Sequence, residues 1–544
     1  MRTLRNKKFL LVLLLIAVAG FLRFFKLGEY PVVLNHDEIS QIYETASIVQ
    51  TGKDIYGNFL PLAFPSTGDY KPGHYIYLST LPYLIFGDQE ATIRVTAAFF
   101  GTLTVLGVFL FVKALTQNWK IAYLSGIMVA FTPSEIFYSR KSFEGVIGES
   151  LIFFGLFALL KGRYIGALLL GLSMYVYTSY IIVVPLLLLF FLRKRFLPLL
   201  LIWLAVTLPL VLLIATNQDL RFRAGSVFIT QDPNFQGSLD YIFNRYLNQF
   251  DPTYLFLNGL NLTDQGVVGM GPLLLLQLPF LILGLFRVNR LLVGLMIVSV
   301  IPSAVTFEQH SPHRATLFFA ALSIISALGL HWFIITSRKP CHFMAGLNAK
   351  VITVFRGKPG GAVRSGFLQF LVNFLRKPRT FSPRKFIRKW FVLLPFLIAG
   401  FLLNFVYFVR IYTVSYPYEK SQSLHYPFVE IAKFAWLKYQ NFDGIVIDPK
   451  FGDVAPETAV AVHYYLAFYG NYPPAKLQGQ LKLGEMSFDK FSIRPVNWGK
   501  DKNLQNTLII ASPWSIPVNS LDKEKIIKTF YFYNGVPAYY AIGL

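Results

Sequence analysis

Hydrophobic residues run in long stretches along this chain, separated by short polar segments. Most stretches are about 16–22 residues long, and a helix of about 20 apolar residues crosses the roughly 30 Å hydrocarbon layer of a membrane. The pattern therefore predicts a polytopic α-helical membrane protein with about eleven spanning helices. The predicted spans are residues 9–26, 91–112, 121–138, 145–160, 163–177, 178–192, 196–215, 271–286, 288–306, 315–336 and 391–409.

One apolar stretch, residues 164–192, has no charged residue and leaves two alternatives open. A single long helix would place Lys161 and Arg163 on the opposite side of the membrane from the basic residues 193–195. A hairpin that turns near residues 178–180 places both clusters on one side, in agreement with the enrichment of Lys and Arg in cytoplasmic loops. We expect the hairpin, with helices so short that the bilayer thins locally or the pair forms a re-entrant segment.

Basic residues gather on one side of this topology. The segments 1–8, 113–120, 161–163, 193–195, 287–290 and 337–390 hold 26 of the 51 Lys and Arg residues and no Asp or Glu. This predicts a cytoplasmic N-terminus and an extracytoplasmic C-terminus in the cell membrane. The net charge of +23 would suggest nucleic acid for a soluble protein. With 54% hydrophobic residues and a mean hydropathy of +0.50, we instead expect membrane lipids as partners and no nucleic acid.

The first apolar run has a second interpretation as a cleavable signal peptide. Four basic residues precede it, and Ala17-Val18-Ala19 resembles a cleavage site. The run continues through Leu22, however, and residues 23–26 are typical of a helix end at the membrane interface. We therefore expect an uncleaved helix.

The chain is predicted to contain two domains. Residues 1–410 form the membrane domain, with outer loops at 27–90 and 216–270 and an inner basic loop at 337–390. The inner loop includes a basic amphipathic segment at 366–377. Residues 411–544 are predicted to form a small extracytoplasmic α/β domain. Its expected elements are a helix at 427–440, buried strands at 444–449 and 507–512, and a C-terminal hairpin that turns at Asn534-Gly535.

The clearest candidate chemistry follows the first span, where Asp37 and Glu38 stand side by side. Ile39, Ile42 and Ala46 recur after them at helical spacing, which predicts a helix along the outer surface. Asp37 is then either the N-cap of this helix or a carboxylate held at the membrane surface as a general base. Composition alone favours the cap.

The same loop carries Lys71 in a Pro-Gly turn, followed by His74 and Tyr75. A lysine in a constrained turn near the membrane can pair with a phosphate. The structural alternative is a lysine that extends its ammonium group to the interface. His74 and Tyr75 are candidate substrate-binding residues beside it.

A second polar cluster joins the third and fourth spans and contains Arg140, Lys141 and Glu144, with Glu149 about one turn inside the fourth span. A charge within a span generally faces the protein interior or a cavity. Arg140 and Glu144 are spaced i, i+4, so they form either a helical ion pair or part of a substrate site.

A third cluster, in residues 307–316, contains Glu308, His310, His313 and Arg314. Glu-x-His-x-x-His can be read as a metal site, but no further ligand set supports it. Arg314 as a phosphate or headgroup ligand is the more economical hypothesis. The single cysteine, Cys341, allows neither an intramolecular disulfide nor a cysteine-rich metal cluster.

These segments together resemble the GT-C superfamily of polyprenyl-phosphate-sugar-dependent glycosyltransferases, in particular its protein O-mannosyltransferase and aminoarabinose-transferase-like branch. LNHDEI resembles that branch's Asp-Glu pair, and DYKPGHYIYL resembles its Lys-Pro-Pro segment, with Gly73 in place of the second proline. FGDQEATIRVTAAFFGTLTV, which includes Arg94, resembles its second span, and TPSEIFYSRKSFE resembles its arginine-bearing loop. The resemblance is good over residues 20–215, looser over 216–410 and architectural in the C-terminal domain.

The resemblance implies an enzyme that moves a monosaccharide from a polyprenyl-phosphate carrier to an acceptor hydroxyl on a protein, lipid or cell-envelope glycan. It implies inversion at the anomeric carbon on the extracytoplasmic side. Asp37 would take the acceptor proton, and Glu38 would shape the site or bind the sugar or acceptor. Lys71, Arg140 and, less strongly, Arg314 would stabilise the departing phosphate, so no metal would be strictly required. Glu144 and His313 are further candidates for substrate binding.

Two other functions remain open from the sequence. A transporter or flippase of lipid-linked sugars would show repeated halves and broken helices near the membrane midplane, and neither is clear here. A catalytically inactive scaffold is disfavoured by the Asp37-Glu38 pair. ATP-driven and dinucleotide chemistry have no support, because the chain has no Walker loop and no Rossmann glycine pattern after a strand. The C-terminal domain is a hypothetical acceptor-binding domain.

Overall fold

A helix lies within each predicted apolar segment. The computed structural model describes residues 2–65, 70–191, 196–216, 228–261, 266–337, 383–521 and 523–544. The helices are α1 (Arg2–Phe24), α4 (Glu90–Thr116), α5 (Trp119–Phe131), α6 (Pro133–Ser139), α7 (Gly145–Leu160), α8 (Ile165–Val176), α9 (Ser179–Leu188), α10 (Phe196–Thr216), α13 (Leu278–Leu285), α14 (Arg290–Ser299), α15 (Ile301–Ala304), α16 (Thr316–Ser337) and α19 (Pro383–Arg410). Cys341, the segment 366–377 and most of the inner loop lie outside the described residues.

The number of membrane crossings is only partly fixed by these helices. Within the described ranges, four helices are long and apolar enough to cross a membrane: 90–116, 197–216, 316–336 and 395–419. The pair α5 and α6, bent by 60°, would make a fifth. Several other apolar helices have only 10–17 residues. The fold is therefore that of a helical membrane protein, but the predicted count of eleven crossings is not confirmed.

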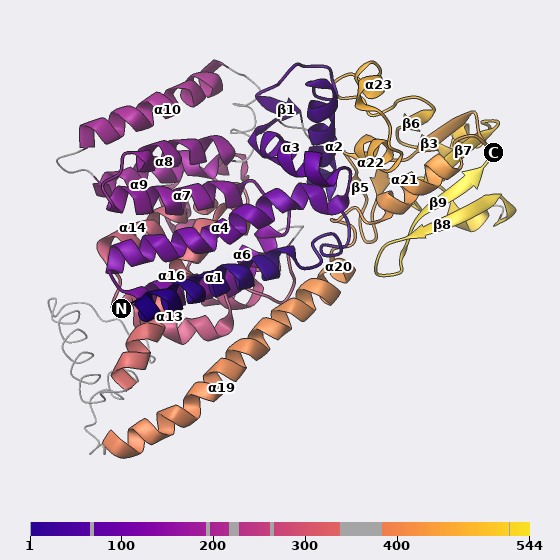
Figure 1. Ribbon diagram of the computed structural model, residues 1–544. Coiled ribbons are helices and arrows are strands. Elements are labelled where there is room, and N and C mark those ends of the chain that lie inside the picture. Colours follow the sequence, from indigo (N-terminus) through magenta and orange to yellow (C-terminus); the bar gives the residue numbers. More distant parts are fainter. Residues whose placement is uncertain are drawn as a thin grey trace.

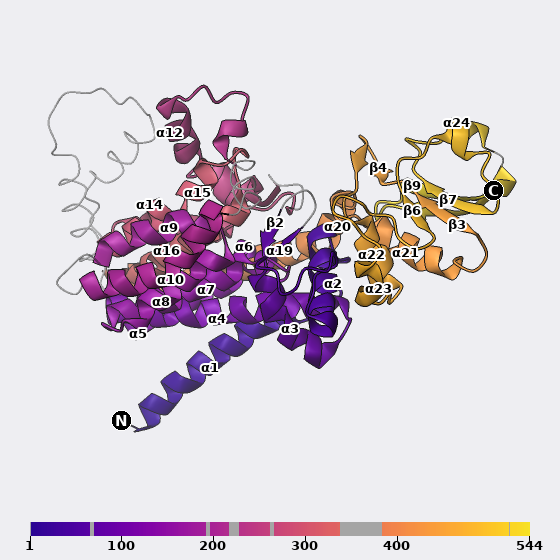
Figure 2. The same cartoon turned by 90° about the horizontal axis from the view of Figure 1, so that it is seen from above.

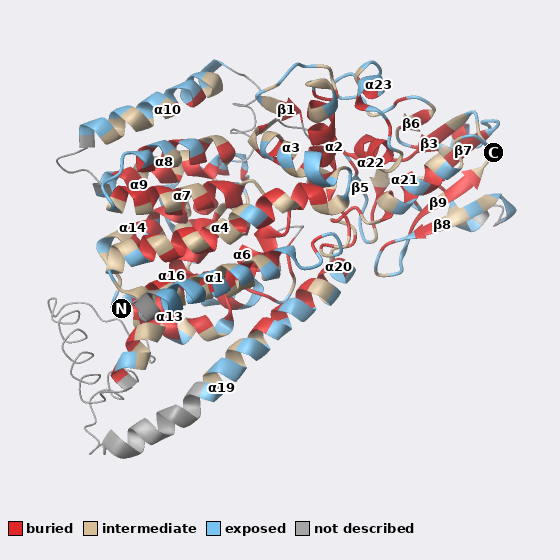
Figure 3. Ribbon diagram, in the orientation of Figure 1, coloured by how far each residue is buried: buried red, intermediate tan, exposed pale blue. Residues whose placement is uncertain are grey.

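The predicted break within residues 164–192 is confirmed, because α8 ends at Val176 and α9 begins at Ser179. At 1.5 Å per residue the 12 residues of α8 rise about 18 Å, well short of a bilayer core of roughly 30 Å. Figure 3 shows that α10 and α19 expose long faces, whereas α4 and α7 are largely buried. The exposed faces are apolar, as a surface in contact with lipid should be, and on α19 they include Leu402, Leu403 and Val406.

Charged side chains inside the bundle face the protein interior. Glu149 is buried on α7, as predicted for a charge within a span, and Glu135 on α6 and Arg23 on α1 are buried as well. Arg23 Nη1 donates to the carbonyl of Ala19 over 3.2 Å.

The break between α5 and α6 occurs at Thr132 and Pro133, where the proline has no N–H to continue the helix.

An outer layer covers one end of the bundle (Figures 1 and 2). It consists of α2 (His36–Thr51), β1 (Ala63–Pro65), β2 (Tyr70–Pro72) and α3 (His74–Phe86). The two strands pair antiparallel, with Phe64 opposite Lys71. The helix predicted after Asp37 is thus confirmed as α2, and its apolar positions Ile39, Ile42 and Ala46 are buried. A second outer segment holds α12 (Leu239–Asn248) and a π-helical turn at Tyr254–Asn258.

The C-terminal unit is a mixed α/β structure at the far end of the molecule from the N-terminus (Figure 1). Its five-stranded sheet has the order β6-β3-β7-β9-β8, with β6, β3 and β7 parallel and β9 and β8 antiparallel to their neighbours. The predicted helix, two strands and Asn534-Gly535 hairpin are all present. The bounds are α20 (Tyr416–Glu419), α21 (Pro427–Leu437), α22 (Val462–Tyr469), α23 (Pro474–Gln478), α24 (Trp498–Asp501), β3 (Gly444–Ile447), β4 (Lys450–Phe451), β5 (Glu457–Thr458), β6 (Phe491–Ile493), β7 (Thr507–Ala511), β8 (Ile526–Tyr531) and β9 (Pro537–Gly543).

One hydrophobic core joins the outer layer to the C-terminal unit. Ile39, Ile42 and Tyr43 of α2 belong to the same buried cluster as Tyr464 and Tyr465 of α22. Hydroxyl groups fix this contact. Tyr43 Oη donates to the carbonyl of Tyr472 over 2.7 Å, and Tyr465 Oη donates to the carbonyl of Leu34 over 2.7 Å. The C-terminal unit is therefore packed directly on the helix that carries the Asp-Glu pair.

Candidate active site

The start of α2 is fixed by a capping box around Asn35, not by Asp37. Asn35 Oδ1 accepts from the backbone N–H of Asp37 over 3.0 Å and of Glu38 over 2.9 Å. In return Glu38 Oε2 accepts from the Asn35 N–H over 3.2 Å. The expectation that Asp37 caps the helix is wrong, because the amide of Asn35 takes that place. Asp37 lies in the first turn with its side chain 34% exposed, where the helix dipole favours its negative charge.

Glu38 is held by a buried ion pair with Arg94 of α4. Arg94 Nε donates to Glu38 Oε1 over 2.8 Å, and Nη2 donates to Oε2 over 3.0 Å. The remaining Arg94 donors reach the backbone carbonyls of Leu27, Pro31 and Val33. Neither side chain is more than 1% exposed. Glu38 therefore anchors the start of α2 to the bundle, and this position favours the site-shaping role over direct substrate binding.

Arg140 is occupied by the backbone at the end of α1. Its Nη1 donates to the carbonyls of Leu22 and Arg23, each over 3.1 Å, and its Nη2 donates to those of Lys26 and Tyr30 over 3.2 and 3.1 Å. Carbonyls at a helix C-terminus have no partner within the helix, so an arginine there stabilises the helix end. The Nε of Arg140 is buried and has no hydrogen-bond partner among the described residues, so it is the one donor that could reach a phosphate while these bonds persist.

Lys141, the next residue, is a second cation near the Asp37–Glu38 pair, because the charges of both carboxylates act on it. Its Nζ lies 4.4 Å from the ring centre of Phe137 and 5.3 Å from that of Tyr416. Burial lowers the pKa of Lys141 to about 7, although the nearby charges of Glu38 and Asp37 oppose this effect. From the sequence, phosphate binding was assigned to Arg140 and not to Lys141. The two cations are adjacent in the chain, and only one of the two side chains can point toward α1.

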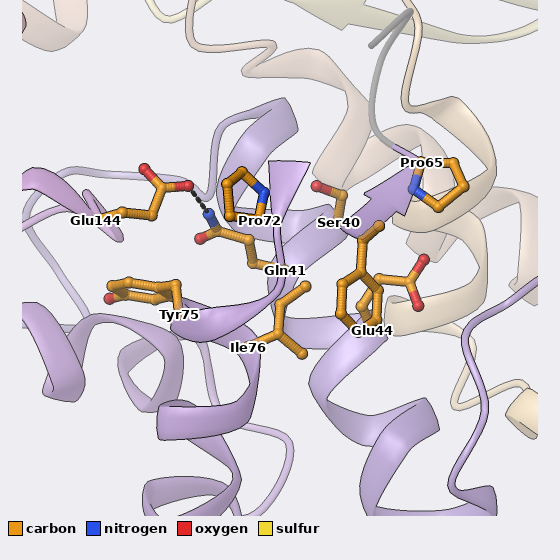
Figure 4. Close-up of a pocket in the computed structure, with 9 residues that line it drawn as sticks. Ser40, Gln41, Glu44, Pro65, Pro72, Tyr75, Ile76 and Glu144 are labelled. Carbon is orange, nitrogen blue, oxygen red and sulfur yellow. Dashed lines mark hydrogen bonds between the residues drawn. The ribbon is translucent and has the colours of Figure 1, made fainter. Parts of the chain in front are cut away.

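A small pocket, partly open to solvent, lies between α2, the two short strands, α3 and the residue that precedes α7 (Figure 4). It is lined by Ser40, Gln41, Glu44, Phe64, Pro65, Pro72, Tyr75, Ile76 and Glu144. Figure 4 shows Gln41 and Glu144 joined across one side, where Gln41 Nε2 donates to Glu144 Oε1 over 3.0 Å. Glu144 thus faces α2 and this pocket, while Arg140 bonds to α1.

Of the other predicted residues of the first outer loop, Tyr75 lines this pocket, whereas Lys71 and His74 are only next to lining residues in the sequence. Lys71 lies in β2 next to the lining residue Pro72, and its side chain lies outside the described part of the chain. Tyr75 is buried and its Oη donates to the carbonyl of Ile93 over 2.7 Å, which is a structural bond. The ring of His74 packs 5.5 Å from that of Tyr175, and burial lowers the pKa of His74.

The third cluster has a structural arrangement of its own. Arg314 Nη1 donates to Ser311 Oγ over 3.2 Å and lies 3.9 Å from Glu308 Oε2. The ring of His310 stacks on Tyr254 at 4.3 Å. His313 faces Phe143, in the turn that carries Lys141, with ring centres 6.3 Å apart. Among the residues that the structure describes, no three His, Cys, Asp or Glu side chains are grouped as metal ligands would be.

Glu44 links the pocket to the C-terminal unit and is expected to make stability depend on pH. Tyr464 Oη donates to Glu44 Oε1 over 2.7 Å, and burial raises the pKa of Glu44 from 4.5 to about 8. Between these values the folded protein holds a proton that the unfolded chain releases, so stability should fall as the pH rises from about 5 to 8. Glu44→Gln should flatten the dependence of Tm on pH in detergent.

The control is Glu430→Gln, which removes a carboxylate that is 55% exposed and paired with Lys528. Its curve of Tm against pH should run parallel to that of the wild type. A Glu44→Gln curve that also runs parallel to the wild type would show that Glu44 is not protonated in the folded protein.

Comparisons with known proteins show the fold of this chain. No protein-family model matches the sequence, and no curated protein sequence matches it. The crystal structure of ArnT from Cupriavidus metallidurans bound to undecaprenyl phosphate matches with a TM-score of 0.56 and 13% identity, over 97% of both chains. Its apo structure matches equally well. The Archaeoglobus fulgidus oligosaccharyltransferase AglB, in complex with an inhibitory peptide and a dolichol-phosphate, matches 86% of this chain and 64% of its own, with 12% identity and a TM-score of 0.46.

The likeness to ArnT extends over both the helical bundle and the C-terminal unit, because it covers nearly the whole of each chain. At this level of identity it is a statement about architecture. The chain therefore has the fold of ArnT, as its resemblance to the GT-C glycosyltransferases implies.

Proposed function

We propose that this protein is a membrane glycosyltransferase. It moves a monosaccharide from a polyprenyl-phosphate carrier to a hydroxyl of a protein, lipid or cell-envelope glycan at the extracytoplasmic face. The observation that carries the proposal is the placement of Asp37. Its partly exposed carboxylate stands in the first turn of a helix that a capping box and the Glu38–Arg94 pair hold rigidly against the bundle.

The surroundings of Asp37 suit a reaction that releases a phosphate. The positive charges of Lys141 and Lys420 lie near each other and near the Asp37–Glu38 pair. The ArnT structure with the same fold is bound to undecaprenyl phosphate, a phosphorylated polyprenol. A cationic site at the lipid-facing end of a bundle can hold such a headgroup while the polyprenyl tail stays in the bilayer.

The transfer would proceed by one displacement. Asp37 removes the proton of the acceptor hydroxyl, and the acceptor oxygen forms a bond to the anomeric carbon. The bond from that carbon to the phosphate oxygen breaks, and its electron pair leaves with the polyprenyl phosphate. Lys141 and Lys71 stabilise the negative charge of the leaving group. Because attack and departure occur on opposite faces of the sugar, its configuration inverts.

The test is transfer of label from radioactive polyprenyl-phosphate monosaccharides to membrane acceptors by the purified protein in liposomes. Label that reaches an acceptor only when the protein is present supports the proposal, and the labelled product identifies the acceptor class. Donor that crosses the bilayer without any labelled product would instead indicate a flippase for lipid-linked sugars.

Lys141→Met should lower kcat by about 10²-fold, the loss typical of one stabilising donor at a developing anion. Since the pKa of Lys141 is about 7, the wild type should also bind the donor more weakly as the pH rises above 7, when the ammonium loses its proton. Lys141→Met should lack this dependence of KM on pH.

Lys433→Met is the matched control, because Lys433 also lies over an aromatic ring, 4.9 Å from the centre of Tyr469, but on the exposed side of α21. Its kcat should stay within about twofold of the wild type, as is usual for surface substitutions. Equal kcat values for Lys141→Met and Lys433→Met would show that Lys141 does not stabilise the leaving phosphate.

A further inference from the structure

His425 reaches the candidate active site from the C-terminal unit. It lies between α20 and α21, in a turn closed by hydrogen bonds from the N–H of His425 to the carbonyl of Gln422 over 2.8 Å and from the N–H of Tyr426 to that of Ser421 over 3.2 Å. Its φ angle is +57°, a left-handed conformation that only a few per cent of non-glycine residues adopt, Asn, Asp and His more often than others. Such conformations cluster at functional sites, where the surrounding structure imposes them.

The ring of His425 has an apolar side and a polar side. Phe451 and Phe428 pack on it with ring centres 5.1 and 5.8 Å away. His36 of α2 lies on it with ring centres 5.0 Å apart and planes inclined by 36°. The Nδ1 atoms of both histidines are buried and have no hydrogen-bond partner. A buried imidazole nitrogen without a partner is costly, which favours a functional reason for the pair.

His36 in turn faces the proposed base. Its Nε2 lies 3.6 Å from Asp37 Oδ1, and its side chain is 24% exposed. Burial and the neighbouring His36 lower the pKa of His425 to about 3, so His425 stays neutral at physiological pH. His36, which is partly exposed and faces Asp37, is the ring of the pair that is placed to receive a proton from that carboxyl group. The charged group against His36 is Asp37, and Lys141, Lys420 and the Glu38–Arg94 pair act on the same Asp37–Glu38 segment.

Building on the proposed function, we propose that His425 is a positioning residue that holds His36 against Asp37. His36 then receives the proton that Asp37 has removed from the acceptor hydroxyl. The proton moves from the Asp37 carboxyl group to His36 Nε2, which leaves Asp37 ionised and His36 as an imidazolium. No bond other than the two O–H and N–H bonds changes in this step. The C-terminal unit would thus complete the active site.

The test is the rate at which diethyl pyrocarbonate modifies the imidazole of His36 at a fixed pH, measured by mass spectrometry. The variant is His425→Asn, since asparagine tolerates the left-handed backbone. Loss of the His425 ring removes a packing contact of His36 and exposes the His36 ring to solvent. His36 should therefore react with the reagent several-fold faster than in the wild type at the same pH.

His463→Asn is the matched control, because His463 is also buried in the C-terminal unit with both ring nitrogens unpartnered. It should leave the rate at which His36 is modified unchanged. Equal rates of His36 modification in the wild type and His425→Asn would overturn the proposal. This measurement does not require sugar transfer, so its result is independent of whether the proposed function is correct.

Transfer kinetics give the second measurement. His425→Asn and His36→Gln should each lower kcat/KM about tenfold, as expected when a proton acceptor is displaced or removed. In the His36→Gln background His425→Asn should have no further effect, because both act through one ring. Full additivity of the two substitutions would also overturn the proposal.

Discussion

Asp37→Asn should reduce kcat/KM for sugar transfer by about 10²–10⁴-fold, the usual contribution of a general base. Asparagine has the shape of aspartate but cannot accept the proton of an acceptor hydroxyl. The substitution leaves the start of α2 unchanged, because Asn35 accepts from the backbone of Asp37, not from its side chain. The variant should therefore insert, fold and bind polyprenyl phosphate as the wild type does.

Glu29→Gln is the control for this experiment, since Glu29 is an exposed carboxylate of the same outer layer that pairs with Lys26 over 2.6 Å. It should transfer sugar at the wild-type rate. The comparison is made with labelled donor in liposomes, with folding checked by size-exclusion chromatography and Tm. Undiminished transfer by a folded Asp37→Asn protein would show that another group takes the acceptor proton.

Arg94→Leu should destabilise the protein by about 3–5 kcal/mol, the cost of leaving one member of a buried ion pair without its partner. The Glu38 carboxylate would remain buried, and the carbonyls of Leu27, Pro31 and Val33 would lose their donor. The outer layer should separate from α4 first, so limited proteolysis near α2 should accelerate before the bundle unfolds.

The measurement is Tm and the rate of proteolysis in detergent. Arg163→Leu is the control, because Arg163 is exposed and follows the C-terminal end of α7, away from the outer layer. Adding Glu38→Gln to Arg94→Leu should restore part of the lost stability, since the second change removes the buried charge. If Arg94→Leu unfolds at the same temperature as the control, the ion pair does not anchor the outer layer.

Helix positions could be predicted from the sequence because hydrophobic runs determine them directly. Both the break between α8 and α9 and the helix after Asp37 follow from local pattern and charge. The number of crossings could not be predicted in the same way. A short helix such as α8 satisfies the hydrophobic pattern whether or not it traverses the bilayer, because packing against neighbours sets its depth.

The roles of individual charges were harder to predict, because they depend on contacts between distant segments. Arg140 and Lys141 are equivalent in sequence, yet one bonds to four carbonyls of the α1 end and the other lies over Phe137 and Tyr416. Asn35 displaced Asp37 as the cap because either side chain can fill that position. His425 is nearly 400 residues from His36, so no local pattern could have joined them.

The core shared by α2 and α22 changes how the C-terminal unit can be studied. Deletion of residues 411–544 would expose Ile39, Ile42 and Tyr43 to water, so a truncated protein that fails to transfer sugar would report a folding defect as readily as a lost acceptor site. Chimaeras between relatives face the same constraint. A C-terminal unit taken from a relative should function only when the α2 helix of the same relative is transferred with it. The two segments are therefore expected to evolve together and should be exchanged together in engineered proteins.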